Sequence, residues 1–419
     1  MTGETASGTD TAAGRFPTAR ATGCPFDPPP EFAALRERDK AAERLSCPAG
    51  IDAHVVSSYA HVRSVLTEPT LSSRWAPSLH VVVNSDFERP LEPGSILQLD
   101  GAEHTRLRRL LTPEFTVRRV QAMRPYIQRL IDERIDAMLA AGAPADLYRD
   151  FALPIPSQVI CELLGVPYED RDRFERQTGV MLSVDRDPAE VAVAYDEVTQ
   201  LMRQLAEDKT AEPTDDLLGR LIVRAREGGQ ELSIPELGML GLSLLVAGHE
   251  TTANMIGLST LALLRRPDQL EALRADPELA ATAVDEMLRY ISPVQFGLLR
   301  RTTGDTPVGD DTLDAGQWLV AALASANRDE TVFPAADRID IGRPATAHLA
   351  FGHGVHQCLG QQLARVELRE VFARLYRRIP TMRLAVPFED IEFKDNALVY
   401  GVRALPITWD EPSEAEDGQ

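Results

Sequence analysis

Apolar residues recur at spacings of three and four along most of the chain beyond residue 100. This period is typical of amphipathic helices that bury one face. Glycine and proline separate the periodic stretches, as at Gly228-Gly229 and Pro235. The pattern predicts helices at His104–Phe115, Arg118–Ala140, Pro156–Leu164, Asp170–Met181, Ala189–Glu207, Asp215–Glu227, Glu236–Leu264, Pro267–Arg274, Pro277–Tyr290 and Leu359–Arg378.

Strand patterning is sparse by comparison. The other predicted elements are helices at Glu31–Leu45 and Tyr59–Leu66, a strand at His54–Ser57, and β-hairpins at Pro307–Ala324 and Ile391–Trp409. The first hairpin is predicted to turn at Asp314-Ala315-Gly316. Segments 72–101 and 327–347 have no regular period, and a loop as long as the first is usually functional or mobile. The chain is therefore predicted to be mainly α, with a small amount of β-structure.

The predicted helix at Glu236–Leu264 is apolar on nearly all sides. Its stretch Gly241–Leu264 would be about 36 Å long at 1.5 Å per residue. That length also suits a membrane span. However, His249, Glu250 and Asn254 lie at its middle, where polar and charged groups are costly in a bilayer. We therefore predict a buried central helix.

The composition is that of a globular protein, with 419 residues, 44% of them hydrophobic, and a formal net charge of −20. This acidity argues against a nucleic-acid or membrane partner. The cysteines Cys24, Cys47, Cys161 and Cys358 are too widely spread for a disulfide framework, so a reducing compartment is expected. Residues 1–22 are predicted to be a disordered tail, because they are polar and lack the apolar core of a signal peptide or anchor. We expect a cytoplasmic protein.

One cysteine, Cys358, lies in the glycine-containing stretch FGHGVHQCLG at Phe351–Gly360, just before a predicted helix. Glycine lets a backbone approach a flat ligand closely. The positive end of a helix dipole favours a thiolate, which is a good ligand for a soft metal. Two other interpretations are a buried free cysteine and a zinc site, since His348, His353 and His356 lie close in sequence. The glycine spacing has no purpose in a zinc site.

The middle of the predicted central helix reads Ala247-Gly248-His249-Glu250-Thr251-Thr252. A glycine inside a helix costs about 1 kcal/mol relative to alanine. A buried carboxylate is also unfavourable unless it has a partner. Two disfavoured choices two residues apart indicate a functional site. The alternative interpretation is a helix kink with a capped polar pair.

Two charged pairs have helical spacing. His104 and Arg108 are four residues apart and can reach one anion, unless they belong to a solvated helix face. Glu286 and Arg289 are three residues apart and face each other on one helix. Taken alone, the second pair is a weak signal, because surface pairs of this kind are common and contribute little.

These stretches resemble motifs of the cytochromes P450. The pattern F-G-x-G-x-H-x-C-x-G at Phe351–Gly360 closely resembles their haem-binding loop, and Ala247–Thr251 resembles their oxygen-binding groove. The segment EHTRLRRLLTPEFT at 103–116 resembles their helix that binds the haem propionates. The resemblance covers about Cys24 to Trp409, with the motifs in the expected order.

The resemblance implies an α+β cytochrome P450 fold in one domain, residues 23–410, with an acidic tail at 411–419. A large helical part, a smaller β-rich part and a long central helix over the haem are expected. Cys358 would be the iron ligand of haem b. Glu250 and Thr251 would organise proton delivery to bound dioxygen. The other haem contacts implied are His104, Arg108, Ala247, Gly248, Arg300, Phe351, Gly352, His356 and Gly360.

Two further sets of residues follow from the resemblance. Glu286 and Arg289 look like the family's structural pair, with Arg343 as the expected third partner and Arg338 as the runner-up. Segment 72–101 would act as a lid over the substrate. The substrate-pocket candidates by family position are Ser243, Val246, Ala247, Phe296, Leu298 and Val399.

The implied reaction inserts one oxygen atom from O2 into an apolar small molecule, such as a secondary metabolite or a xenobiotic, by hydroxylation or epoxidation. The chain ends just after the haem domain, so electrons are expected from a separate ferredoxin and an NAD(P)H-dependent reductase. The enzyme is expected to be a monomer. A peroxide-driven haem-thiolate enzyme and a haem sensor or carrier are alternatives, but neither needs the Glu250–Thr251 pair. The candidates for ferredoxin docking are Arg106, Arg109, Arg118, Arg119, Arg365 and Arg369.

Overall fold

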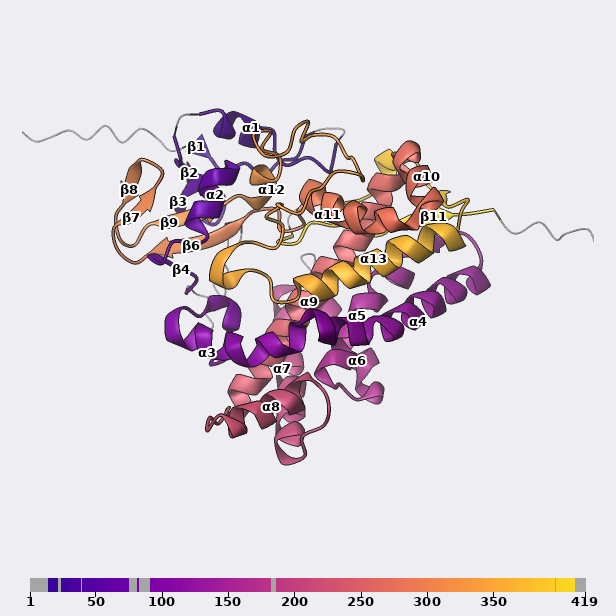
Figure 1. Ribbon diagram of the computed structural model, residues 1–419, viewed down its shortest axis with the longest axis horizontal. Helices are drawn as coiled ribbons and strands as arrows, with labels where there is room; N and C mark the ends of the chain where they lie inside the picture. Colours follow the sequence, from indigo (N-terminus) through magenta and orange to yellow (C-terminus); the bar gives the residue numbers. More distant parts are fainter. Residues whose placement is uncertain are drawn as a thin grey trace, which may run out of the picture.

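The computed structural model describes residues 14–21, 24–38, 40–74, 81–82, 91–181, 186–395 and 397–410. A helical part, below and to the right in Figure 1, packs beside a β-rich part at the upper left. The described helices are α1 (Glu31–Arg36), α2 (Tyr59–Val65), α3 (Gly101–Leu111), α4 (Val117–Ala141), α5 (Pro154–Leu164), α6 (Arg171–Met181), α7 (Pro188–Ala211), α8 (Leu217–Glu227), α9 (Ile234–Leu264), α10 (Pro267–Ala275), α11 (Ala280–Ile291), α12 (Leu323–Ala326) and α13 (Gln361–Arg378).

The β-rich part is built on one six-stranded sheet with the order β1-β2-β3-β9-β6-β4. The pairs β1–β2 and β3–β9 are parallel, and the other neighbours are antiparallel. Two smaller sheets, β10-β11-β5 and β7-β8, are not hydrogen-bonded into it. The strands are β1 (Gly14–Arg15), β2 (Glu43–Ser46), β3 (Asp52–Val56), β4 (Leu71–Ser72), β5 (Ala145–Asp146), β6 (Leu298–Thr302), β7 (Thr306–Val308), β8 (Asp311–Leu313), β9 (Trp318–Ala321), β10 (Arg383–Leu384) and β11 (Pro406–Thr408).

The central helix α9 passes through the helical part, with α5, α7 and α13 against it (Figure 1). Its first turn is stabilised by Ser233, whose hydroxyl accepts the amide of Glu236 at 3.3 Å. Buried leucines and methionines line most of its length. No helix in the described ranges is long and apolar enough to cross a membrane. The predicted mainly α fold with a small β-rich part is therefore confirmed.

Three predicted elements are wrong in detail. The helix expected at Glu31–Leu45 ends at Arg36, and Glu43–Ser46 is strand β2, held by pairing with β3. The hairpin β7–β8 turns between Val308 and Asp311 rather than at Asp314, and β9 pairs with β3 and β6 instead.

The hairpin expected at Ile391–Trp409 is reduced to a single bridge between Phe393 and Val402. Strand β11 pairs with β10 and β5 instead of with the preceding residues. For β9 and β11, pairing with strands distant in sequence decides the structure, and local patterning does not show it.

The N-terminal boundary also differs from the prediction. Residues 14–21, expected in a disordered tail, include strand β1 and the buried Phe16. The ring of Phe16 meets that of Phe32 edge-on, with 5.9 Å between the ring centroids. Burial of this aromatic side chain and pairing with β2 account for the difference. The expected tails at 1–13, 22 and 411–419, and positions 75–80 and 83–90 of the expected lid at 72–101, lie outside the described residues.

Candidate active site

The cysteine loop is shaped by two glycines in the left-handed region, Gly352 with φ of 68° and Gly354 with φ of 74°. A Cβ atom on Gly354 would lie 2.4 Å from the carbonyl oxygen of Leu66, so only glycine fits there. The amide of Cys358 donates to the carbonyl oxygen of Phe351 at 2.8 Å. These constraints fix the position of the sulfur just before α13.

The surroundings of Cys358 Sγ oppose the usual effect of burial. Burial raises the pKa of the thiol, while the amides of Gly360 and Gln361 and the cations Arg108 and Arg365 lower it. Donors and cations of this kind stabilise a sulfur that carries negative charge. Burial outweighs these groups, so the pKa of the thiol stays above its ordinary value. A soft metal cation such as haem iron, bound to the sulfur, would supply the further positive charge that a buried thiolate needs.

The zinc interpretation is not supported. Within the described part of the chain, no three His, Cys, Asp or Glu side chains are placed to hold a metal together. His348 faces Asp285, with Nε2 3.6 Å from Oδ1. All four cysteines are unpaired, and burial raises the pKa of Cys161 to about 12, as expected for an inert structural thiol.

Four of the predicted propionate contacts form one basic cluster. The rings of His104 on α3 and His356 lie 4.2 Å apart, and His356 Nε2 is 3.3 Å from Asp100 Oδ1. Burial, followed by His104 and Arg300, lowers the pKa of His356 to about 4. Burial lowers the pKa of Arg300 to about 10, and burial and then Arg108 lower that of His104. These groups repel one another's charge, so the cluster fits the two carboxylates of a haem.

One face of α9 is accessible where the helix is otherwise buried. Accessible residues on this face are Ser243, Val246, Ala247, Gly248 and Thr251. Ala247 is exposed although it lies in the middle of the helix. The hydroxyl of Thr251 donates to the carbonyl oxygen of Ala247 at 2.7 Å, and the helix continues without a break. A smooth face of small side chains fits a flat ligand, and the kink interpretation is not supported.

Glu250 does not share that face. Its Oε1 lies 3.2 Å from Lys394 Nζ, in a cluster with Tyr148 and Asn254. Burial raises the pKa of Glu250 above its usual range, and Lys394 and then Asn254 offset only part of that rise. Reasoning from the sequence missed Lys394, which lies 144 residues from Glu250 in no motif. The only signal was that lysine is rare in this chain, the others being Lys40 and Lys209.

The structural pair is fully buried. Arg289 Nε and Nη2 donate to Glu286 at 2.7 and 2.9 Å, and neither side chain is exposed. Arg343 Nε reaches Glu286 Oε1 at 3.2 Å, while Arg338 contributes only its carbonyl oxygen. The amide of Asp340 donates to the same carboxylate at 2.9 Å. The third side chain is therefore that of Arg343, and this network holds the segment that leads to the cysteine loop.

The remaining substrate-pocket candidates lie in different places. Leu298 borders the cysteine loop, since a Cβ on Gly352 would be 3.8 Å from its Cδ1. Val399 is bridged to Val294 and is partly exposed. Phe296 is 3% exposed and packs in the core of the six-stranded sheet. Its assignment to the substrate pocket stays a prediction.

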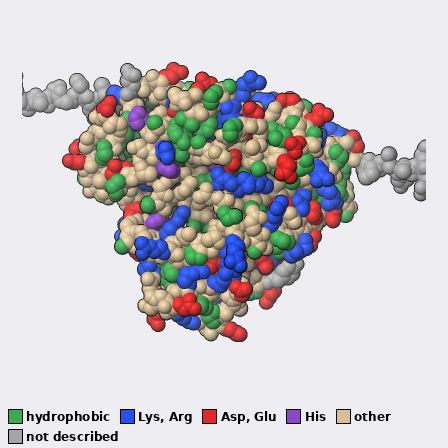
Figure 2. Space-filling model, viewed as in Figure 1, with side chains coloured by type: hydrophobic (Ala, Val, Ile, Leu, Met, Phe, Trp, Pro, Cys, Tyr) green, Lys and Arg blue, Asp and Glu red, His purple; other side chains and the backbone are tan. Residues whose placement is uncertain are grey.

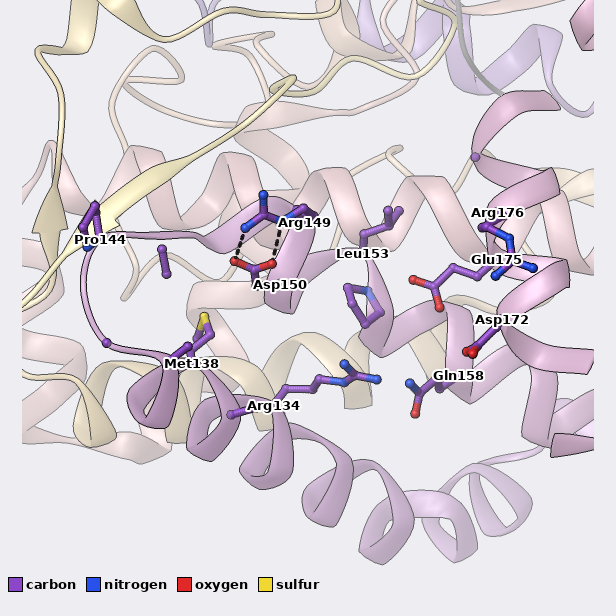
Figure 3. Close-up of a pocket in the computed structure, with 16 residues that line it drawn as sticks. Arg134, Met138, Pro144, Arg149, Asp150, Leu153, Gln158, Asp172, Glu175 and Arg176 are labelled. Carbon is purple, nitrogen blue, oxygen red and sulfur yellow. Dashed lines mark hydrogen bonds and ion pairs between the residues drawn. The ribbon is translucent and has the colours of Figure 1, made fainter. Parts of the chain in front are cut away.

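A pocket of about 770 Å³ lies away from all of these residues (Figure 3). It is lined by α4, α5, α6 and the connection after α4. Arg134 and Glu175 border it, and Arg149 and Asp150 form an ion pair at its rim, with contacts of 2.6 and 2.8 Å. None of its lining residues is a predicted site residue, so it is not the candidate active site.

Comparison with known proteins agrees with this geometry. A family model described as Cytochrome P450 matches residues 184–399. The chain is 44% identical over 394 residues to Cytochrome P450-SU2 of Streptomyces griseolus, covering 94% of this chain and 96% of that protein. It is 43% identical over 397 residues to Pentalenic acid synthase of Streptomyces avermitilis, covering 94% and 97%.

Solved structures show the same relationship. The crystal structure of CYP105P1 in complex with filipin I matches with a TM-score of 0.89 at 42% identity, and the match covers 96% of this chain and 100% of that one. With this similarity along nearly the whole chain, and with a haem-compatible cysteine loop, the protein belongs to the cytochrome P450 family and is a monooxygenase.

Proposed function

We propose that this enzyme inserts one oxygen atom from O2 into an apolar small molecule, with Cys358 as the haem ligand and electrons from a separate ferredoxin and its NAD(P)H-dependent reductase. The observation that carries the proposal is the sulfur of Cys358, fixed by the glycine loop beside amide donors and two arginines. Thiolate-ligated haem iron supplies the oxygen activation when it is bound.

The residues of the chain divide the remaining work. Arg108, Arg300, His104 and His356 would hold the haem carboxylates. Thr251 would pass protons on the accessible face of α9, and Glu250 would supply them from the buried side. This division explains why an acid and an alcohol are adjacent in the middle of a helix.

The proposed substrate is rich in hydrocarbon, either a secondary metabolite or a xenobiotic. Val246, Ala247, Leu298 and Val399 are apolar and accessible or partly accessible, which favours an apolar ligand. Ser243 on the same face offers one hydroxyl. A relative is named for pentalenic acid and a similar structure binds filipin I, so the known ligands of similar proteins differ and do not select one substrate.

The proposed ferredoxin site lies on the face that Figure 2 shows, where basic side chains gather over α3, the start of α4 and α13. Arg109 of α3 and Arg118 and Arg119 of α4 are exposed, and so is Val117, which precedes Arg118 in the chain. Of the other candidates, Arg106 is paired with Glu236, and Arg365 and Arg369 are partly buried. The unpaired cysteines suit the reducing cytoplasm proposed for this protein.

The CO-difference spectrum of the reduced protein tests the assignment of Cys358. The wild-type protein is expected to give the Soret band of a thiolate-ligated haem, and Cys358→His is expected to lose that band while keeping its helical content. Cys47→Ser, at another buried cysteine, is the control and should retain the band. A histidine-type band from fresh, folded wild-type protein would overturn the proposal.

The substrate class is tested by a screen for the low-spin to high-spin change of the haem, followed by product analysis. Apolar compounds are expected to produce the change and to be recovered with one added oxygen atom. If strongly polar compounds alone produced the change, the assignment of an apolar pocket would be wrong.

A further inference from the structure

A buried polar cluster connects α9 to the C-terminal part of the chain. Lys394 Nζ lies 2.8 Å from Tyr148 Oη, 3.2 Å from Glu250 Oε1 and 3.4 Å from Asn254 Oδ1. The Lys394 and Glu250 side chains are 17% and 12% exposed. A lysine with this degree of burial needs compensating partners, and these three residues supply them.

The backbone around the cluster is shaped for this contact. A Cβ atom on Gly401 would lie 2.0 Å from Asn254 Oδ1, so a larger residue where the chain crosses α9 would displace the Asn254 side chain. The amide of Lys394 donates to the carbonyl oxygen of Gly401 at 2.9 Å, which sets the lysine directly against the helix. Gly257, one turn further on, allows Tyr148 to approach. The position of Lys394 is thus determined by packing at several points.

The groups that face Glu250 come from each neighbouring element. Lys394 comes from the C-terminal segment, Tyr148 from the π-helical turn η3 (Tyr148–Ala152), and His249 and Asn254 from α9 itself. Burial, then Lys394, lowers the pKa of His249 to about 4, so this ring is neutral at physiological pH. Asp146 of β5 acts on the cluster only through Tyr148.

Among the described residues of this cluster, Lys394 is therefore the one that carries a positive charge. Burial lowers the pKa of Lys394, but Tyr148 and Glu250 raise it further, and the balance leaves it above the ordinary value. The lysine thus stays charged across the physiological range. Its charge acts on Glu250 at 3.2 Å in surroundings that exclude most water.

The helix geometry separates this carboxylate from its neighbour in the motif. Glu250 and Asn254 are four residues apart and share the face that meets Lys394, whereas Thr251 and Ala247 share the accessible face. The acid is therefore held on the buried side of α9, and the hydroxyl is on the ligand side.

We propose that Lys394 is a positioning residue that holds the carboxylate of Glu250 on the buried side of α9 and opposes its protonation there, and so sets the pH range over which Glu250 delivers protons to Thr251. In each transfer, Glu250 takes up one proton from the solvent side and releases one toward Thr251, so its charge is restored. This inference rests on the proposed role of Glu250 and Thr251 in proton delivery.

The direct test follows Glu250 itself by infrared difference spectroscopy as a function of pH, on the haem-loaded protein. In Lys394→Gln, the carboxylic-acid band of Glu250 is expected to persist to a pH higher by about one unit or more than in the wild type, because the opposite charge is gone. The double variant Lys394→Gln with Glu250→Gln identifies the band by losing it. An unshifted band in Lys394→Gln would overturn the proposal.

Matched variants separate this effect from general damage. Lys394→Arg keeps the charge and is expected to keep the titration near that of the wild type. Lys209→Gln removes another partly buried lysine, paired with Asp216 between α7 and α8, and should change nothing. A shift of the band in Lys209→Gln, or no difference between Lys394→Arg and Lys394→Gln, would show that Lys394 acts by packing alone.

The second readout is the fraction of electrons that reach product rather than peroxide. In Lys394→Gln, the pH profile of this fraction is expected to move upward together with the infrared titration. A uniform fall at every pH would contradict the proposal. If Glu250→Gln leaves the fraction unchanged while Lys394→Gln still shifts the band, the proton-delivery role is wrong although Lys394 holds the carboxylate.

Discussion

Glu250 and Thr251 are neighbours in the chain but face different surroundings. The carboxylate is 3.2 Å from Lys394 Nζ, while the hydroxyl donates to the carbonyl oxygen of Ala247 at 2.7 Å. Since a hydroxyl has one proton and two acceptor positions, Thr251 presents an oxygen that accepts hydrogen bonds on the accessible face. It is therefore arranged to receive a proton there.

Thr251→Ala tests that role. The variant is expected to fold and to bind haem normally, because Thr251 is only partly buried. Product formed per electron should fall by about tenfold or more, with peroxide rising in its place. Electron consumption, product and peroxide are measured together, and Thr251→Ser, which keeps the hydroxyl, is the control. Unchanged coupling in Thr251→Ala would remove this residue from the mechanism.

Glu367 on α13 is a second buried acid, and it predicts a pH dependence of stability. It is 3% exposed, and burial raises its pKa to about 8 from an ordinary value of 4.5. The folded protein therefore binds a proton that the unfolded chain releases. As a result, Glu367 lowers the free energy of unfolding as the pH rises from 4.5 to 8, and its effect is constant above pH 8.

Glu367→Gln should remove this dependence. The gain in the free energy of unfolding over the wild type is expected to grow from near zero at pH 4.5 to about 4–5 kcal/mol at pH 8. Calorimetric melting of the haem-loaded protein between pH 5 and 9 measures it, with Glu133→Gln on the exposed surface of α4 as a control without this trend. A constant difference at all pH values would contradict the assignment.

Among the elements, α11 holds in place the connection 327–343, which has little regular structure. Arg289 of α11 donates to the carbonyl oxygens of Asn327 and Ala336 at 2.8 Å each, as well as to Glu286. These bonds replace the ladder hydrogen bonds that an irregular segment lacks. Segment 327–343 is consequently held by α11, and the cysteine loop follows it directly.

Alanine variants of three arginines rank these contacts by their contribution to the free energy of unfolding. Arg289→Ala leaves a buried carboxylate without its main partner, and is expected to lower the free energy of unfolding by about 3–5 kcal/mol and to reduce haem content. Arg343→Ala should cost less, about 1–3 kcal/mol. Arg338→Ala, whose side chain is exposed, should cost less than about 0.5 kcal/mol. Denaturant unfolding measures all three, and equal losses at Arg338 and Arg343 would contradict the ranking.

Helices were predictable because their signals are local. The period that predicted Leu359–Arg378 corresponds to α13, where Leu363, Val366 and Val371 are buried. The prediction failed at Glu31–Leu45, because Leu45 is a strand residue that pairs with Ala53. Strand pairing depends on partners elsewhere in the chain, which a local period does not contain.

The residues of the candidate site also divide into those that a local motif predicts and those that depend on contacts across the whole molecule. Cys358, its glycines and the acid–alcohol pair lie in short motifs, so the sequence predicted them. Asp100 and Lys394 were missed, because they meet their partners across 256 and 144 residues. Phe296 packs in a buried cluster, and the sequence alone does not separate an apolar residue that lines a pocket from one that fills the core.

Charge is distributed unevenly over the molecule, and this matters for the electron donor. The chain carries a net charge of −20, yet basic side chains gather on the face shown in Figure 2. Arg109 of α3 and Arg118 and Arg119 at the start of α4 are exposed. A local basic surface would attract an acidic ferredoxin despite the overall repulsion.

Reversing these three charges to glutamate should slow reduction by ferredoxin by about tenfold or more at low ionic strength, and should flatten its salt dependence. Reduction is followed by stopped-flow absorbance at several salt concentrations. Arg383→Glu, which is exposed near the C-terminal sheet, is the matched control and should reduce at the wild-type rate. An unchanged rate in the triple variant would place the docking surface elsewhere.

The contact between the two ends of the domain has a consequence for how the protein is made. The guanidinium of Arg20 lies 3.6 Å from the ring centroid of Tyr400, and its Nε donates to Gln295 at 3.2 Å. During synthesis at about 5–20 residues per second, Tyr400 leaves the ribosome roughly 20–80 s after Arg20. Arg20 therefore has these two partners only late in synthesis, although β1 and Phe16 can already pack against β2 and Phe32.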